Sequence, residues 1–255
     1  MTAGPNSAER ILAILDLFDE GRLDWRPEEM MQRLGYARPT LYRYLRTLRD
    51  AGFLVSQPGG AWSLGPKVVE LDFLMRKADP LIRAGRGELH AIVADWTGAA
   101  LLVRWYGQRL LCVASECAEG APVTSYPRGR PMPLAKGAIS RAILAYLPKG
   151  QQAAIAAENR AAFAEVGMPD EAAVLDALRL VRRDGVAVAR GEVTPGVLGV
   201  AAPVFDEGRQ PVAALCLTTD QRQNEPRLED IKDEVRRRAA RIGRSLVGEK
   251  DRETP

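Results

Sequence analysis

The segment from residue 37 to residue 54, ARPTLYRYLRTLRDAGFL, constrains the fold more than any other part of the chain. Its leucines Leu41, Leu45 and Leu48 recur at intervals of four and three residues, which is the spacing of one face of an α-helix. Four arginines occupy other positions, and no acid precedes Asp50. The pattern therefore predicts a short helix that packs a leucine stripe on a core and turns a cationic face to water.

The flanking residues predict the other elements of a winged helix-turn-helix domain. Residues 7–20 and 27–34 have helical patterns, and residues 53–64 predict two short strands around a Pro-Gly-Gly turn. Three helices followed by a hairpin place the third helix where it can enter the major groove of DNA. We expect these residues to face the DNA: Arg38, Thr40, Tyr42, Arg43 and Arg46.

An arginine-rich helix can also be a solvated face without a partner, or a helix that lies on a membrane surface. The short turn before this helix, the lack of acids and the hairpin after it favour DNA, because phosphate groups line the groove. The membrane interpretation is disfavoured because the apolar stripe is needed by the core of the domain.

Residues 66–78, PKVVELDFLMRKA, predict a linker helix that is apolar on more than one face. Such a helix needs two partners, so it is a candidate dimer contact. One helix-turn-helix reads only a few base pairs, which also favours a homodimer on two half-sites. We therefore expect a DNA-binding domain at 1–65, the linker helix at 66–78 and an effector-binding domain at 79–250.

The second half of the chain alternates helical and strand patterns. Two apolar strands flank Gly107, residues 133–147 and 149–184 are predicted to be helical, and a strongly predicted hairpin follows. A final amphipathic helix over 226–247 has one apolar side for packing on a sheet. This order is typical of a mixed α/β domain.

The motifs argue against an enzyme. The single histidine, His90, lies in a helical pattern, and a Ser-His-Asp or Cys-His set would have to use it. We interpret His90 as a surface or packing residue. The chain carries no phosphate-binding loop, dinucleotide-binding motif or zinc-protease motif. We expect no catalytic residue, no cofactor and no metal site.

Three cysteines, Cys112, Cys117 and Cys216, are too few and too scattered for a disulfide framework. We expect Cys112 and Cys117 to be buried, inert thiols, and the alternative is a regulator on the same DNA-binding frame that senses oxidants through a thiol. No apolar run approaches the ~20 residues of a membrane span, and the N-terminus lacks a signal-peptide core. We therefore expect a cytoplasmic protein without a membrane partner.

Taken in order, several motifs resemble the IclR family of bacterial transcriptional regulators, over essentially the whole chain. They are AERILAILDLF, GYARPTLYRYLRTLRDAGFL and AWSLGPKVVEL in the first part, then RGRPMPLAKGAISRAILA and DGVAVARGEVTPGVLGVAAPVFDEGRQPVAAL. The resemblance implies an α/β (α+β) chain with a winged helix-turn-helix, a linker helix and a GAF-like effector-binding domain. It also implies homodimers or dimers of dimers, and a palindromic double-stranded DNA operator.

The resemblance further implies an effector pocket, and here the chain departs from the family pattern. Members that sense two- or three-carbon acids use an Asp and a Cys, and the matching positions are Ala189 and Gly199. A pair of hydroxyls in the family becomes Cys216 and Thr218. Compared with those members, the expected pocket of this chain loses polar groups and gains volume. We expect an aromatic or similarly sized organic acid, such as a hydroxybenzoate, in place of glyoxylate or pyruvate.

The rest of the expected pocket comes from the preceding signature and the start of the hairpin. Its residues are Thr124, Met132, Leu134, Ala138, Ile139 and Val197. Most of them are apolar, and apolar burial with a few orienting polar groups is typical of small-molecule pockets. Backbone N–H groups around Ala138 and Ile139, at a helix start, are expected to hold the carboxylate.

Overall fold

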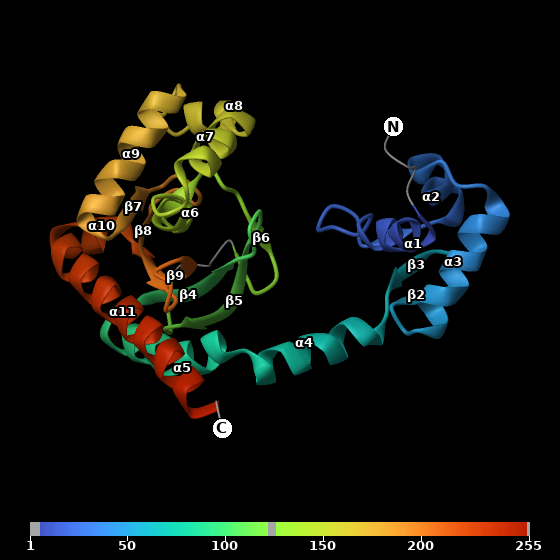
Figure 1. Ribbon diagram of the computed structural model, residues 1–255, viewed down its shortest axis with the longest axis horizontal. Coiled ribbons are helices and arrows are strands. Elements are labelled where there is room, and N and C mark those ends of the chain that lie inside the picture. Colours follow the sequence, from blue (N-terminus) through green and yellow to red (C-terminus); the bar gives the residue numbers. More distant parts are fainter. Residues whose placement is uncertain (1–5, 122–125, 254–255) are drawn as a thin grey trace. The chain divides into compact units, whose positions relative to one another are not determined.

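The structure is a computed structural model that describes residues 6–121 and 126–253. The chain divides between Asp79 and Pro80 into two compact units, and each is described by itself (Figure 1). The mixed helix and sheet organisation predicted from the sequence is confirmed, with short helices in the first unit and a larger sheet in the second.

The first unit contains four helices and a small antiparallel sheet in the order β1-β3-β2. Its elements are α1 (Ser7–Leu15), β1 (Asp24–Trp25), α2 (Pro27–Leu34), α3 (Arg38–Asp50), β2 (Leu54–Ser56), β3 (Trp62–Leu64) and α4 (Pro66–Ala78). The predicted helices at 27–34 and 66–78 and the predicted hairpin are confirmed. The strand β1 was not predicted, because two residues carry no alternating pattern.

The turn between α2 and α3 depends on Gly35. Its φ angle is +68°, a left-handed conformation that glycine adopts without the steric cost of a Cβ atom. Its N–H donates to the Met31 carbonyl and closes α2. Pro39 then lies in the first turn of α3, where its missing N–H costs nothing. The helix-turn-helix geometry is therefore encoded locally.

The first helix is shorter than predicted. Asn6 and Glu9 form a capping box at its start, but α1 ends at Leu15 and does not continue to residue 20. The indole Nε1–H of Trp25 donates to the Leu17 carbonyl at 2.9 Å. This buried tryptophan therefore bonds to the backbone just beyond the end of α1, a contact for which the sequence pattern carried no signal.

The core of the first unit holds the leucine stripe of α3. Leu41, Leu45 and Leu48 are buried, as predicted, together with Tyr44 on the same helix. Their buried neighbours come from α1 and the segment after it, from β1 and α2, and from the two strands of the wing. They are Ile14, Leu17, Trp25, Met30, Leu54 and Trp62. Packing of this stripe fixes which side of α3 faces outward.

The second unit is built on a six-stranded antiparallel sheet in the order β6-β5-β4-β9-β8-β7. The strands are β4 (Gly98–Trp105), β5 (Leu110–Cys117), β6 (Pro131–Met132), β7 (Ala187–Arg190), β8 (Val197–Phe205) and β9 (Pro211–Asp220). The helices are α5 (Pro80–Asp95), α6 (Gly137–Leu144), α7 (Lys149–Glu158), α8 (Arg160–Ala164), α9 (Glu171–Asp184), α10 (Gln221–Asn224) and α11 (Leu228–Glu253), with a 3-10 turn at Glu225–Arg227.

Helices cover both faces of this sheet (Figure 1). One apolar cluster packs α5 and α11 against one face, and a second packs α6 to α9 against the other. Alternate residues of each strand serve the two clusters, as the pleat requires: Leu102 and Leu215 face α5 and α11, whereas Leu101 and Cys216 face α6.

The predicted helix at 133–147 is shortened to α6, Gly137–Leu144. Met132 still belongs to β6, and the chain bends before the helix. Gly137 has a φ angle of +86°, which interrupts any helical path from residue 133. A Cβ atom there would also lie 3.2 Å from Val193 Cγ2, so the position favours glycine for two reasons.

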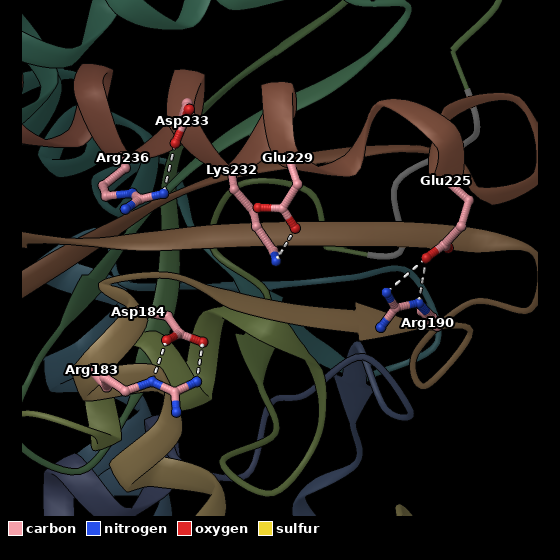
Figure 2. A network of polar contacts seen from close by, with 8 residues as sticks. All are labelled: Arg183, Asp184, Arg190, Glu225, Glu229, Lys232, Asp233 and Arg236. Atoms are coloured by element: carbon pink, nitrogen blue, oxygen red, sulfur yellow. Dashed lines mark hydrogen bonds and ion pairs between the residues drawn. The ribbon is translucent and has the colours of Figure 1, made fainter.

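Exposed ion pairs lie along the surface formed by the end of α9, β7 and the start of α11 (Figure 2). They are Arg183–Asp184, Arg190–Glu225, Lys232–Glu229 and Arg236–Asp233. The hydrogen bond from Arg190 lowers the pKa of the Glu225 carboxyl, and Arg183 lowers the pKa of Asp184 in the same way. Solvent screens such pairs, so they contribute little to stability.

Candidate functional site

The outward face of α3 carries the residues predicted to contact DNA. Arg38, Tyr42, Arg43 and Arg46 are exposed, and Thr40 is half-buried. Leu41, Leu45 and Leu48 anchor the opposite side in the core, so these side chains share one face of the helix.

The charge on this face is available to a partner. Arg49 pairs with Asp50 at 3.0 Å, but none of the ion pairs among the described residues involves Arg43 or Arg46. These arginines and Tyr42 border a surface depression whose far side is Trp62 of β3 in the wing. A cationic helix beside a hairpin is the arrangement by which a winged helix-turn-helix contacts a duplex.

A cavity lies in the second unit between the sheet and α6, where three neighbouring strands carry small side chains. Ala189 of β7 pairs with Gly199 of β8, and Gly199 pairs with Thr218 of β9. Because these positions are cross-strand neighbours, their small volumes add up to one hollow. A volume of about 70 Å³ is open to the centres of water-sized molecules, several times what a single water needs.

The remaining walls come from α6, the segment before it and the loop 191–196. The lining residues are Leu101, Tyr126, Met132, Pro133, Lys136, Gly137, Ala138, Ile139, Ser140, Ala189, Glu192, Val193, Thr194, Val197, Gly199, Cys216 and Thr218. The surface of this cavity is predominantly apolar. Apolar walls with a few polar groups are the usual composition of a small-molecule site.

Most of the predicted effector residues meet at this cavity. The lining includes Met132, Ala138, Ile139, Ala189, Val197, Gly199, Cys216 and Thr218. Leu134 lies elsewhere, in a surface depression beside α7, because the chain bends after β6 and the strand alternation does not continue. Thr124 falls outside the described residues.

Sequence reasoning missed an ion pair in the cavity wall. Arg141 of α6 holds the Glu192 carboxylate with both terminal nitrogens, at 2.8 Å and 2.7 Å. Gly137 N–H, at the start of α6, donates to the same carboxylate at 2.9 Å. The Arg141 and Glu192 side chains are only 8% and 18% exposed. The one available signal was an arginine inside an otherwise apolar helix, which requires a buried partner.

Two hydroxyl groups of the cavity lining, those of Thr218 and Ser140, use their protons in hydrogen bonds to backbone carbonyls. Thr218 Oγ1 donates to the Ala99 carbonyl at 3.2 Å, and Ser140 Oγ lies 3.2 Å from the Lys136 carbonyl. A hydroxyl has a single proton, so both groups can only accept from a ligand. Among the lining side chains, Lys136 carries a positive charge, and its ammonium also pairs with Glu165 at 2.5 Å.

The cysteines divide into two buried thiols and one exposed thiol. Burial raises the pKa of Cys112 to about 11 and that of Cys216 to about 12. Cys117, at the end of β5, is exposed, so the expectation of buried thiols is wrong for this residue. A redox sensor needs a thiolate, and the raised pKa values disfavour that state at Cys112 and Cys216.

The histidine and the metal-binding side chains were further candidates for chemistry. His90 lies exposed on α5, and no group of three or more metal-binding side chains gathers in the parts that the structure describes. No helix of the described chain is both long enough and apolar enough to cross a bilayer.

Comparison with known proteins identifies both units. The family model for the IclR helix-turn-helix domain matches residues 7–58, and the model described as "Bacterial transcriptional regulator IclR C-terminal" matches residues 101–244. The chain is 26% identical over 247 residues to the HTH-type transcriptional regulator XynR of Escherichia coli, covering 94% of this chain and 96% of that protein.

Solved structures share the fold over the whole length. An IclR transcriptional regulator from Alicyclobacillus acidocaldarius superposes with a TM-score of 0.79 at 26% identity, covering 96% of this chain and all of that one. An IclR homologue from Microbacterium hydrocarbonoxydans, solved in complex with 4-hydroxybenzoate, gives 0.78 at 17% identity, covering 94% and 99%.

These matches confirm the fold class and the family that the motifs indicated. The winged unit corresponds to the family's helix-turn-helix, and the six-stranded sheet with its helices corresponds to the C-terminal domain. The chain belongs to the IclR family of bacterial transcriptional regulators and combines that family's helix-turn-helix with its effector domain.

Proposed function

We propose that this regulator binds a palindromic operator as a homodimer or a dimer of dimers and responds to an aromatic monocarboxylic acid. The observation that carries the DNA half is the cationic face of α3 beside the wing. Arg43 and Arg46 are exposed and form no ion pair among the described residues. They can therefore bind a phosphate or the edge of a guanine without displacing a protein acid.

The dimer rests on α4. None of its side chains is buried within the unit, and its apolar residues Val69, Phe73 and Leu74 are 73%, 64% and 54% exposed. A helix of this composition is stabilised by burying those residues against a second copy. Two recognition helices then read two half-sites about one helical turn apart, ~34 Å.

The effector half rests on the cavity between α6 and the sheet. Small residues on three strands open the cavity, and its apolar walls favour the burial of an apolar ring by ~25 cal/mol per Å². A two-carbon acid has too little apolar area to profit from these walls. A protein of the same fold binds 4-hydroxybenzoate, which supports a ligand of this size. Lys136, a cation in the lining, suits the carboxylate of the ligand.

The chain carries out this function without catalysis. His90 is exposed on α5, and no motif of a cofactor-dependent enzyme occurs in the sequence. The regulator needs no cofactor in this proposal, and it works in the bacterial cytoplasm, where the chromosome lies.

The DNA half is tested by selecting bound sequences from random duplex DNA with wild-type protein. The recovered sites should contain an inverted repeat. On the best site, Arg43→Ala should lower affinity by about 1–3 kcal/mol and reduce the slope of log affinity against log salt by about 0.9 for each lost phosphate contact.

Arg179→Ala is the matched control, because this arginine is 75% exposed on α9 in the other unit. It should leave operator affinity unchanged. Wild-type affinity in the Arg43→Ala protein at matched salt would remove α3 from the interface, and recovered sites without two-fold symmetry would remove the palindrome.

The effector half is tested by calorimetry with 4-hydroxybenzoate, benzoate, pyruvate and glyoxylate. The aromatic acids should bind more tightly than the two small acids. Tighter binding of pyruvate or glyoxylate than of either aromatic acid would contradict the proposed effector class.

A further inference from the structure

Glu192 places a carboxylate in the wall of an otherwise apolar cavity. Its oxygens receive hydrogen bonds from Gly137 N–H at 2.9 Å and from Arg141 at 2.8 Å and 2.7 Å. We propose that Glu192 selects effectors that present a hydrogen-bond donor at the α6 end of the cavity and excludes those that present a second carboxylate there. This inference rests on the proposed aromatic-acid function of the same cavity.

The Glu192 carboxylate is held in place too firmly for a ligand to displace it. Arg141 is 8% exposed, and its Nη2 also donates to the Val188 carbonyl at 2.8 Å. Separating a buried ion pair leaves both charges uncompensated, which is far more costly than the pair itself. The Gly137 N–H at the start of α6 is therefore already bonded to a protein carboxylate. The like charge of Glu192 disfavours a ligand carboxylate beside it, in contrast to the expectation from sequence for the N–H groups around Ala138 and Ile139.

The same carboxylate keeps the capacity to bind a donor. Two ionised oxygens accept about four hydrogen bonds. Within the described parts of the chain, Oε2 receives two, from Gly137 and Arg141, and Oε1 receives one, from Arg141. A phenolic hydroxyl or an amine of the ligand can take the remaining position on Oε1.

Two hydroxyl side chains of the lining have the same preference. Thr218 and Ser140 line the cavity, and each has given its only proton to a backbone carbonyl. Their oxygens can accept from a ligand but cannot donate to one. A donor group on the ligand therefore meets several acceptors, whereas a second carboxylate meets acceptors and the like charge of Glu192.

The lining also carries an ammonium group. Lys136, the N-cap residue of α6, is 31% exposed and keeps donors beyond its bond to Glu165, so it is the lining side chain that suits a ligand carboxylate. Glu192 suits a donor. A ring that carries both a carboxylate and a hydroxyl can satisfy both side chains.

The experiment uses three para-substituted benzoates of similar size and the full-length protein. Isothermal calorimetry is run with 4-hydroxybenzoate, 4-methylbenzoate and benzene-1,4-dicarboxylate. Wild-type protein should bind the hydroxyl compound about tenfold more tightly than the methyl compound, because a hydrogen bond to a charged group is gained. The dicarboxylate should bind more weakly than both.

Glu192→Gln should reverse the order of affinity of 4-hydroxybenzoate and benzene-1,4-dicarboxylate. The amide keeps the shape of the side chain, but it leaves the Arg141 charge without a counter-ion, and the second carboxylate of the dicarboxylate can supply one. We expect the dicarboxylate to gain at least about tenfold relative to 4-hydroxybenzoate. Glu171→Gln, the same change at an exposed position on α9, should leave all three affinities unchanged.

A double variant keeps the test decisive if Glu192→Gln unfolds. Arg141→Met combined with Glu192→Leu replaces the buried pair by apolar groups, a change that proteins often tolerate. This protein should prefer 4-methylbenzoate to 4-hydroxybenzoate. The comparison is made between ligands within one variant, so a general loss of stability does not move the ratio.

The experiment distinguishes a wrong effector class from a wrong role for Glu192. If wild-type protein binds its operator but none of the three benzoates, the effector class is wrong and this inference falls with it. If wild-type protein binds the benzoates, but the dicarboxylate binds as tightly as the hydroxyl compound, or Glu192→Gln leaves the order unchanged, the role of Glu192 alone is overturned.

Discussion

Arg238 of α11 lies 3.1 Å from the carboxylate of Glu88 in α5, and both side chains are nearly buried, at 11% and 12% exposed. The same guanidinium contacts Asp95 at 2.9 Å and also pairs with Glu234. One arginine therefore pairs with three acids from two helices that cover the same face of the sheet.

We expect Arg238→Ala to lower the free energy of unfolding of the second unit by about 3–5 kcal/mol, because the nearly buried Glu88 and Glu234 lose their buried counter-charge and keep only exposed arginines. Arg241→Ala is the control: Arg241 also contacts Glu88, at 3.0 Å, but it is 57% exposed. Its loss should cost less than about 1 kcal/mol. Urea denaturation followed by circular dichroism measures both, and equal costs for the two variants would refute the distinction.

Substitution in α4 should separate assembly from folding. Phe73→Glu places a charge on the exposed apolar face, so we expect a monomer at micromolar concentration in sedimentation velocity and a weakened hold on the operator. Leu180→Glu, at a side chain 53% exposed on α9, makes the same kind of change outside α4 and should keep the dimer. A Phe73→Glu dimer that binds the operator normally would rule out α4 as the contact.

Gly199 controls the size of the cavity. A Cβ atom there would lie 3.9 Å from Ala138 Cβ and from the Ala189 carbonyl, which is ordinary contact, so Gly199→Ala should fold as the wild type does. Gly199→Trp should fill the space and abolish the response to 4-hydroxybenzoate while operator binding is kept. Calorimetry and fluorescence anisotropy test the two properties, and an unchanged response in the tryptophan variant would mean that the effector binds elsewhere.

The three thiols should react at very different rates. With pKa values of about 11 and 12, roughly one in a thousand or fewer of the Cys112 and Cys216 thiols are ionised at pH 8, and both are buried. Cys117 is exposed and should react with iodoacetamide first. Raising the pH toward 11 should increase the thiolate fraction of Cys112, but burial still limits its rate.

Mass spectrometry of the alkylated protein locates the label, and Cys117→Ser should remove the fast phase while operator binding is kept. Loss of operator binding after mild peroxide treatment, reversed by a reductant and absent in Cys117→Ser, would instead support the thiol-sensing alternative.

The sequence by itself determined the winged unit almost completely. Leu41, Leu45 and Leu48 recur at a helical spacing, so the buried side of α3 and its arginine side follow from local periodicity. Gly35 and the Pro-Gly-Gly turn mark the breaks between elements in the same local way. The family motifs, in turn, placed Ala189 and Gly199 in one effector pocket, and the β7–β8 register pairs them.

Only the tertiary structure decided the contacts between residues that are distant along the chain. Arg141 and Glu192 are 51 residues apart, and no periodicity links them; they meet because the loop after β7 returns to the start of α6. The hydrogen bond from the Trp25 indole to the Leu17 carbonyl, just beyond the end of α1, is likewise a contact that no periodicity predicts. Local spacing encodes which face of an element is apolar, whereas the partner of a buried charge depends on where the loops bring the chain back.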